Sequence, residues 1–200
     1  MKELFTDIID SYLNDHIGID NNFLSKSLAK ELKQGLIDIQ VKKLLKVASI
    51  GNNDKKAHDL TVRGDQIYWL DRIHNKPCEN AFFDLIDSFV SYLNKTCYTG
   101  ITSYEFHYTL YETGSFYKKH LDQFQNNDSR KFSMVIYLND NWLATDGGEL
   151  CIHHQGTVQH ISPDNRKGVF FKSDELFHEV LTTNKPRMSI TGWLKVNPLN

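Results

Sequence analysis

The sequence predicts an α+β fold in which N-terminal helices support a double-sheet, jelly-roll-like core. Two observations lead to this prediction. Up to about residue 100, apolar residues recur at the three- and four-residue intervals of amphipathic helices. From Thr102 onward, short β-branched and aromatic runs alternate with turn-forming segments such as "ATDGG", "SPDNRKG" and "TTNKP". Helices followed by many short strands are typical of an α+β chain whose strands form a sandwich or barrel.

Three helices and one short strand are expected in the N-terminal half. The first helix is predicted over about 2–15, and the short strand "HIGI" follows it. Asn21 or Asn22 could cap the second helix, and a third helix is predicted over about 79–95. The polar segment 49–59, "SIGNNDKKAHD", is interpreted as a surface loop. The apolar stripe of each helix is expected to pack in the core.

The C-terminal half is expected to supply the strands of the core. The predicted strands are "SYEFHYTLY", "FSMVIYL", "GELCIHH", "GVFFK", "HEVLTT" and "RMSITGWLKV". Because side chains alternate along a strand, "FSMVIYL" should direct Met134 and Ile136 to one face and Val135 and Tyr137 to the other.

The bulk composition indicates one domain over 1–200, with a helix-rich part over about 1–100 and the β core over about 101–197. A formal net charge of −2 gives no electrostatic reason to expect nucleic acid or an anionic membrane as a partner. No apolar stretch is long enough to span a bilayer, and acidic residues interrupt the N-terminal segment where a signal peptide would be apolar. The three cysteines lack C-x-x-C spacing, which fits a reducing, cytoplasmic location.

His120 and Asp122 form an H-x-D pattern that suggests a metal site. On a strand, residues two apart project from the same face, so the imidazole and the carboxylate should point together. These are two of the three ligands in the 2-His-1-carboxylate arrangement, which holds non-haem Fe(II) and leaves coordination positions open. The candidate third ligand is His178, within "ELFHEVLTT". In a chain with nine histidines, one H-x-D pair also arises by chance, so the pair alone decides nothing.

A candidate carboxylate receptor follows the third ligand. Arg187 lies nine residues after His178 across the turn-forming "TTNKP", so a hairpin could place it on the neighbouring strand. Its guanidinium offers a bidentate fork for a carboxylate, and Ser189 shares its face. Tyr137 either packs in the core with its hydroxyl satisfied or donates to the same carboxylate. Such a receptor beside a metal triad suits an enzyme that holds a dicarboxylate keto acid against iron.

Taken together, these motifs resemble a known family. The run "YETGSFYKKHLD", then "YLN", "DGGEL", "SDELFHEV" and "RMSITGW", is similar to the 2-oxoglutarate- and Fe(II)-dependent oxygenases. The upstream "VRGDQIYWL" adds a likeness to the prolyl hydroxylases of the oxygen-sensing (HIF prolyl hydroxylase) type and their bacterial relatives. The likeness covers most of the chain and implies a double-stranded β-helix, which is the jelly-roll core of this family.

The resemblance also implies roles for individual residues, in three groups. The expected iron ligands are His120, Asp122 and His178. The residues expected around 2-oxoglutarate are Arg187, Tyr137, Tyr111, Ser189, Leu150 and Val180. The residues expected at the substrate loop and mouth are Arg63, Asp65, Arg130 and Trp193. Within the last group, the resemblance suggests that Asp65 pairs with Arg130, and a lid over the substrate is expected at about 49–65.

The implied reaction is hydroxylation of prolyl residues in a cytosolic protein, coupled to decarboxylation of 2-oxoglutarate to succinate and CO2. Fe(II), 2-oxoglutarate and O2 would be required, with ascorbate as reductant. The expected partner is a protein that carries the target proline, and a translation factor is a candidate. Two alternatives stay open. The same iron chemistry could act on a small molecule or another side chain, or the chain could be a non-catalytic jelly-roll binding module.

Overall fold

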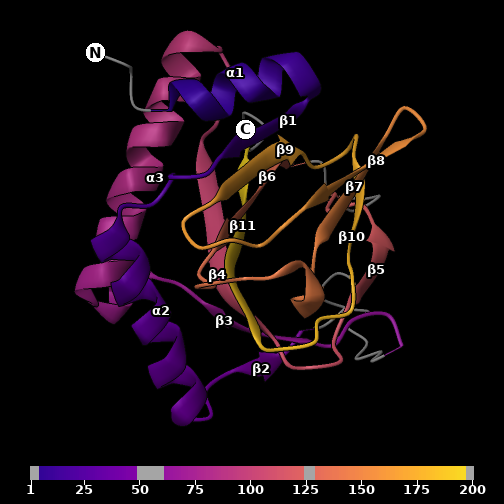
Figure 1. Cartoon of the computed structure of the whole chain (residues 1–200). Coiled ribbons are helices and arrows are strands. Elements are labelled where there is room, and N and C mark those ends of the chain that lie inside the picture. The colour runs from indigo at the N-terminus through magenta and orange to yellow at the C-terminus, as the bar shows by residue number, and fades with distance from the viewer. Residues whose placement is uncertain (1–4, 49–60, 124–128, 197–200) are drawn as a thin grey trace.

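The computed structural model describes residues 5–48, 61–123 and 129–196, and it contains three helices beside two antiparallel β-sheets (Figure 1). The predicted α+β class and jelly-roll core are confirmed. The predicted loop at 49–59, and with it most of the expected lid, lies outside the described residues.

Each of the three helices buries an apolar stripe. Helix α1 spans Thr6–Asp15, α2 spans Lys26–Val41 and α3 spans Pro77–Thr96. The predicted cap of α2 at Asn21 or Asn22 is wrong, because Ser25 accepts a hydrogen bond from the backbone N–H of Leu28. Instead, the N–H of Asn22 donates to the Asp20 carboxylate in a local turn. Among the described residues, no helix is long and apolar enough to cross a membrane.

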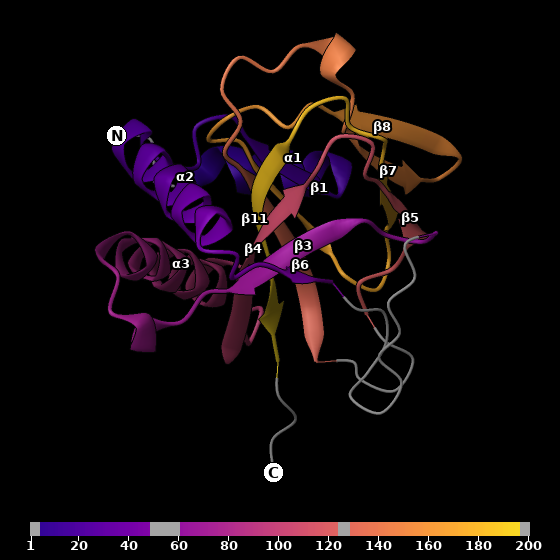
Figure 2. The same ribbon diagram turned by 90° about the horizontal axis from the view of Figure 1, so that it is seen from below.

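The larger sheet has seven strands in the order β1-β9-β6-β11-β4-β3-β2. Their bounds are β1 Ile17–Asp20, β2 Lys46–Val47, β3 Asp65–Trp69, β4 Ser103–Tyr111, β6 Arg130–Tyr137, β9 Gly168–Lys172 and β11 Arg187–Lys195. β11 lies at the centre, paired with β4 on one side and β6 on the other. Helices α2 and α3 cover the outer face of this sheet, as the two views show (Figures 1 and 2).

The smaller sheet has four strands in the order β5-β10-β7-β8 and faces the inner side of the larger one (Figure 1). Their bounds are β5 Tyr117–His120, β7 Leu150–His154, β8 Thr157–Ile161 and β10 Phe177–Val180. Two short 3-10 helices, η1 Arg72–His74 and η2 Ala144–Asp146, lie in the connections.

Two apolar cores result from this layering. Met134 and Ile136 belong to the core between the helices and the larger sheet. Val135 and Tyr137 belong to the core between the two sheets. The predicted alternation of "FSMVIYL" is therefore confirmed, and it means that β6 contributes one face to each core. The inter-sheet core is where the candidate site residues gather.

Candidate active site

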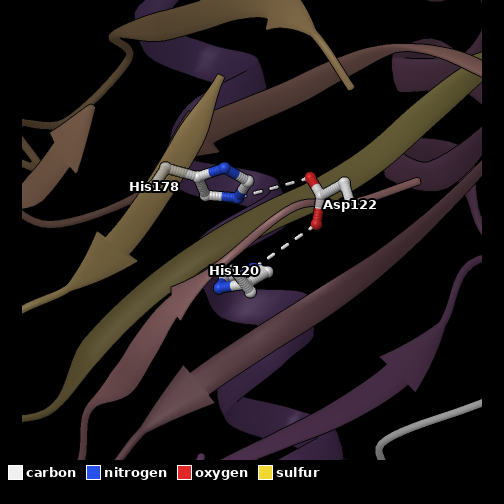
Figure 3. A group of neighbouring side chains, drawn as sticks. All are labelled: His120, Asp122 and His178. Atoms are coloured by element: carbon white, nitrogen blue, oxygen red, sulfur yellow. Dashed lines mark ion pairs between the residues drawn. The ribbon is translucent and has the colours of Figure 1, made fainter. Parts of the chain in front are cut away.

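The three candidate metal ligands converge at the smaller sheet (Figure 3). His120 is the last residue of β5, and His178 lies directly opposite it on β10 in the strand register. Asp122 does not continue the strand as expected. It lies in a bend just after β5, and this bend turns its carboxylate toward both imidazoles.

The distances and hydrogen bonds of this triad fit a divalent metal ion. Each Asp122 oxygen lies 3.5 Å from one histidine Nε2, Oδ1 from His120 and Oδ2 from His178, and the three ligand atoms all lie within 4.8 Å of one another. Each Nδ1 lies close to a backbone carbonyl, at 2.7 Å from that of Lys118 for His120 and at 3.0 Å from that of Leu176 for His178. With the proton on Nδ1 donated to that carbonyl, each Nε2 keeps its lone pair for a metal.

The protonation states also suit a cation. Burial lowers the pKa of His120. Burial alone would raise the pKa of Asp122, but His178 and His120 hold it well below its usual value. Burial opposes the charge on His178 too, yet the Asp122 carboxylate raises the pKa of this imidazole. The carboxylate is therefore ionised, and a bound cation would take the place of the His178 proton.

A pair of buried hydroxyls supports the Asp122 carboxylate, and sequence reasoning missed it. Ser133 Oγ on β6 donates to Asp122 Oδ2 at 2.7 Å and lies 2.9 Å from Ser173 Oγ. Both serines are fully buried. The alternation of "FSMVIYL" could have indicated Ser133, because it shares the Tyr137 face, but nothing local connects it with Ser173.

Replacing Ser133 by alanine should weaken metal binding about tenfold, because removing a residue that hydrogen-bonds to a metal ligand typically lowers metal affinity 10–100-fold. The carboxylate would lose the hydrogen bond that fixes its rotamer. Titration of the purified protein with Co(II) measures the change, and Ser88→Ala on the exposed face of α3 is the control. Unchanged Co(II) affinity in Ser133→Ala would contradict a supporting role for this hydroxyl.

Arg187 lies at the start of β11 with only 1% of its surface exposed. Its Nε donates to the Gly148 carbonyl at 2.8 Å, which leaves the two terminal nitrogens for a carboxylate. Gly148 has a φ of +66°, and a Cβ there would come within 3.1 Å of Arg187 Cδ. The second glycine of "DGGEL" therefore leaves room for the arginine.

The predicted partners of Arg187 surround it. The rings of Tyr111 and Tyr137 lie with their centroids 5.1 and 5.0 Å from its Cζ. Among the described residues, the buried hydroxyls of Tyr137 and Ser189 have no hydrogen-bond partner of normal geometry. Burial raises the pKa of Tyr137 to about 12, although the guanidinium opposes this, so the phenol remains a donor at neutral pH. A bound carboxylate would satisfy these groups and the arginine at once.

The predicted hairpin between His178 and Arg187 is wrong. β10 belongs to the smaller sheet and β11 to the larger one, so the segment "TTNKP" crosses between sheets instead of turning back along one. Arg187 and the metal ligands consequently lie on opposite sheets around the same inter-sheet core. Leu150 and Val180, both buried in this core, line it from the smaller sheet.

The mouth residues pair differently from the expectation. Asp65 does not pair with Arg130. Instead, both its carboxylate oxygens are bound by Arg63, at 2.7 and 2.6 Å. Arg130 lies over the Trp193 ring, 3.5 Å from its centroid, and pairs with Glu105 at 2.7 Å. Glu105 lies opposite Trp193 in the β4–β11 register, beside the ring that Arg130 covers, and this places its carboxylate within reach of Arg130. Asp65 is bound instead by Arg63, which lies two residues before it in the chain.

His107 is a packed strand histidine. It is buried on β4, and its ring lies 5.0 Å from that of Trp69 and 5.6 Å from that of Trp193. Burial lowers the pKa of His107 to about 4, so it is neutral at physiological pH. It therefore contributes shape and packing at the mouth.

The family model of the "2OG-Fe(II) oxygenase superfamily" matches residues 106–195, from β4 to β11 and across all three candidate ligands and Arg187. This part of the chain is therefore similar in sequence to the 2OG-Fe(II) oxygenase superfamily. Members of this superfamily need Fe(II), 2-oxoglutarate and O2, which agrees with the predicted family, the predicted enzyme class and these three predicted cofactors.

The most informative relatives of this chain are prolyl hydroxylases. The prolyl hydroxylase EGLN3 of Mus musculus is 33% identical over 153 residues, which are 66% of this chain and 58% of the relative. The chain thus spans a little over half the length of the curated relatives it matches. A crystal structure of a Pseudomonas putida prolyl-4-hydroxylase matches with a TM-score of 0.86 and 29% identity, covering 98% of this chain and 100% of that one.

A further solved structure shows a relative with a bound peptide. This is a prolyl hydroxylase from Trichoplax adhaerens in complex with a peptide of the oxygen degradation domain of hypoxia inducible factor. It matches with a TM-score of 0.85 and 26% identity, covering 96% of this chain and 89% of that one. The predicted likeness to prolyl hydroxylases is therefore confirmed, because both solved structures and the curated relative are prolyl hydroxylases.

Proposed function

We propose that this chain is a 2-oxoglutarate- and Fe(II)-dependent dioxygenase that hydroxylates prolyl residues of a cytosolic protein. One observation carries the proposal. Three metal-ligand atoms converge on one sheet, while a buried arginine with two unsatisfied hydroxyls beside it lies on the sheet opposite. A pure binding module has no need of both features. Residues 1–200 would act together as a single oxygenase domain.

In this proposal His120, Asp122 and His178 hold the metal. Two neutral imidazoles and one carboxylate leave coordination positions open for the co-substrate and O2. Bound there, Fe(II) and 2-oxoglutarate supply the oxidising chemistry, in which 2-oxoglutarate is decarboxylated to succinate and CO2. The protein contributes the orientation of its ligands, through the Lys118 and Leu176 carbonyls and through Ser133.

Arg187 would bind the distal carboxylate of 2-oxoglutarate, and the hydroxyls of Tyr137 and Ser189 would each donate a hydrogen bond to it. A charged side chain that is 1% exposed is costly to bury alone, and an anionic co-substrate offsets this cost. Tyr111, whose ring also faces the guanidinium, would lie near the keto-acid end. Leu150 and Val180 would pack the carbon chain of the co-substrate and exclude water.

The mouth would admit a protein segment. The exposed Trp69 presents aromatic surface there, with the buried Trp193 beside it. The partly exposed Arg63 and Arg130, paired with Asp65 and Glu105, would form its charged rim. The Trichoplax adhaerens relative binds a protein peptide, which supports a prolyl substrate for this chain too. We propose a cytosolic protein as the substrate, with a translation factor as the first candidate and ascorbate as the reductant.

The substrate can be found by mass spectrometry. The purified protein, loaded anaerobically with Fe(II) and 2-oxoglutarate, is added with air to a lysate of its own host. The expected result is a single-oxygen gain mapped to a proline of one protein and absent with Asp122→Ala. A gain only on another residue type would contradict the prolyl assignment.

The alternative substrates give different outcomes in the same experiment. Succinate production without any peptide gain would keep the oxygenase and point to a small molecule. Absence of both succinate and peptide gains would favour the non-catalytic binding module. The alternatives are therefore separated by two readouts, peptide mass and succinate.

A further inference from the structure

Three flat groups are stacked at the edge of the candidate metal site. The rings of Tyr117 and His120 lie nearly parallel, with centroids 3.6 Å apart and planes at 15°. On the Tyr117 ring, the guanidinium carbon of Arg63 lies 4.2 Å from the centroid. The order is guanidinium, phenol and imidazole, so the stack begins outside the metal triad and ends on one of its ligands.

The outer member of this stack is itself held firmly. The Arg63 guanidinium forms a two-pronged ion pair with Asp65, whose side chain is 1% exposed. The backbone is fixed as well, because the N–H of Lys118 donates to the Val62 carbonyl and the N–H of Gly64 donates to the Phe116 carbonyl. The segment 62–64 thus runs beside β5, along the edge opposite β10.

The two histidines of the triad are supported unequally. His178 is buried, and the Phe171 ring packs against it at 4.8 Å between centroids. His120 is partly exposed at the end of a strand of only four residues. One hydrogen bond at Nδ1 fixes the direction of its ring edge but leaves the ring free to tilt about that bond. The Tyr117 face removes this freedom.

We propose that Tyr117, held by Arg63 and Asp65, is the positioning residue that keeps the His120 imidazole oriented for metal binding. This inference rests on the proposed function, since it concerns a ligand of the proposed iron site. The Arg63–Asp65 ion pair would then contribute to the metal site indirectly, because it holds the tyrosine ring that supports the His120 ligand. Tyr117 does not touch the metal position and acts only through His120.

The test compares Co(II) affinity in variants that keep or lose the flat ring. Tyr117→Leu removes the stacking face, and we expect about tenfold weaker Co(II) binding with a changed ligand-field absorption spectrum. Tyr117→Phe keeps the ring, and we expect affinity within about twofold of the wild type, because the hydroxyl makes only a long contact of 3.4 Å with Arg63. Tyr117→Met, whose unbranched side chain also lacks a flat ring but adapts more easily to its surroundings, replaces the leucine variant if that one fails to fold.

Controls separate this inference from the proposed function. Phe177→Leu removes an exposed aromatic ring on β10, next to His178 but on the opposite face, and should bind Co(II) like the wild type. Equal affinity and spectra in Tyr117→Leu and the wild type would overturn the positioning role, as would equal losses in Tyr117→Phe and Tyr117→Leu. Failure of the wild type to bind Co(II) through Asp122 would overturn the metal site, and the positioning role with it.

Discussion

Replacing Asp122 by alanine is expected to lower Fe(II) affinity more than about 100-fold and to abolish succinate formation. Loss of a residue that hydrogen-bonds to a metal ligand typically lowers metal affinity 10–100-fold, so loss of the ligand itself should lower the affinity further. Asp122 is also the only carboxylate in the triad, and both imidazoles point their Nε2 atoms toward it. Without it, two neutral imidazoles would have to hold a divalent cation alone.

Anaerobic titration with Fe(II) measures this loss, and thermal unfolding of the metal-free protein shows whether the variant folds. The matched control is Asp174→Ala, which removes an exposed carboxylate four residues before His178. The control should keep both Fe(II) affinity and turnover. Fe(II) binding and succinate formation at wild-type levels in Asp122→Ala would rule out the triad as the metal site.

Replacing Arg187 by leucine is expected to raise the KM for 2-oxoglutarate roughly 30-fold or more. Removing one member of a buried, hydrogen-bonded charge pair typically costs about 2–5 kcal/mol, and about 1.4 kcal/mol corresponds to a factor of ten. The Tyr137 and Ser189 hydroxyls would remain but could not neutralise the carboxylate. Fe(II) affinity should stay within a fewfold of the wild type, because Arg187 lies on the other sheet.

A change of co-substrate provides a specific rescue. A 2-oxo acid with an apolar end, such as 4-methyl-2-oxopentanoate, should be decarboxylated better by Arg187→Leu than by the wild type. The control is Lys185→Met, which removes a neighbouring cation that pairs with Asp146 at the surface. An unchanged KM for 2-oxoglutarate in Arg187→Leu, or a raised one in Lys185→Met alone, would assign the carboxylate to another residue.

Much of the fold follows from short-range patterns in the sequence. The strand alternation of "FSMVIYL" predicts which face of β6 enters which core, since the period of two is a property of the strand itself. By contrast, "VRGDQIYWL" indicates only a family likeness, and the strand β3 within it was not predicted. His120, Asp122 and His178 could be grouped because ligand types and spacing limit the choice, even though Asp122 lies in a bend.

The remaining features depend on how distant segments meet. The crossing from β10 to β11 looks like a hairpin locally, because turn residues do not reveal which sheet the next strand joins. The Ser133–Ser173 contact and the Glu105–Arg130 pair join strands far apart in the chain. Asp65 was expected to reach Arg130, but a guanidinium two residues away binds it with both prongs. Such competition is decided by packing.

The central claim is that the triad and Arg187 form one Fe(II)- and 2-oxoglutarate-dependent site, and succinate formation tests it most directly. Purified protein is incubated in air with 2-oxoglutarate, with and without Fe(II), in the absence of any other substrate. We expect slow, Fe(II)-dependent release of succinate in the wild type, none in Asp122→Ala, and recovery in Arg187→Leu only at much higher 2-oxoglutarate. Absence of succinate from a folded, Fe(II)-loaded wild type would contradict the claim.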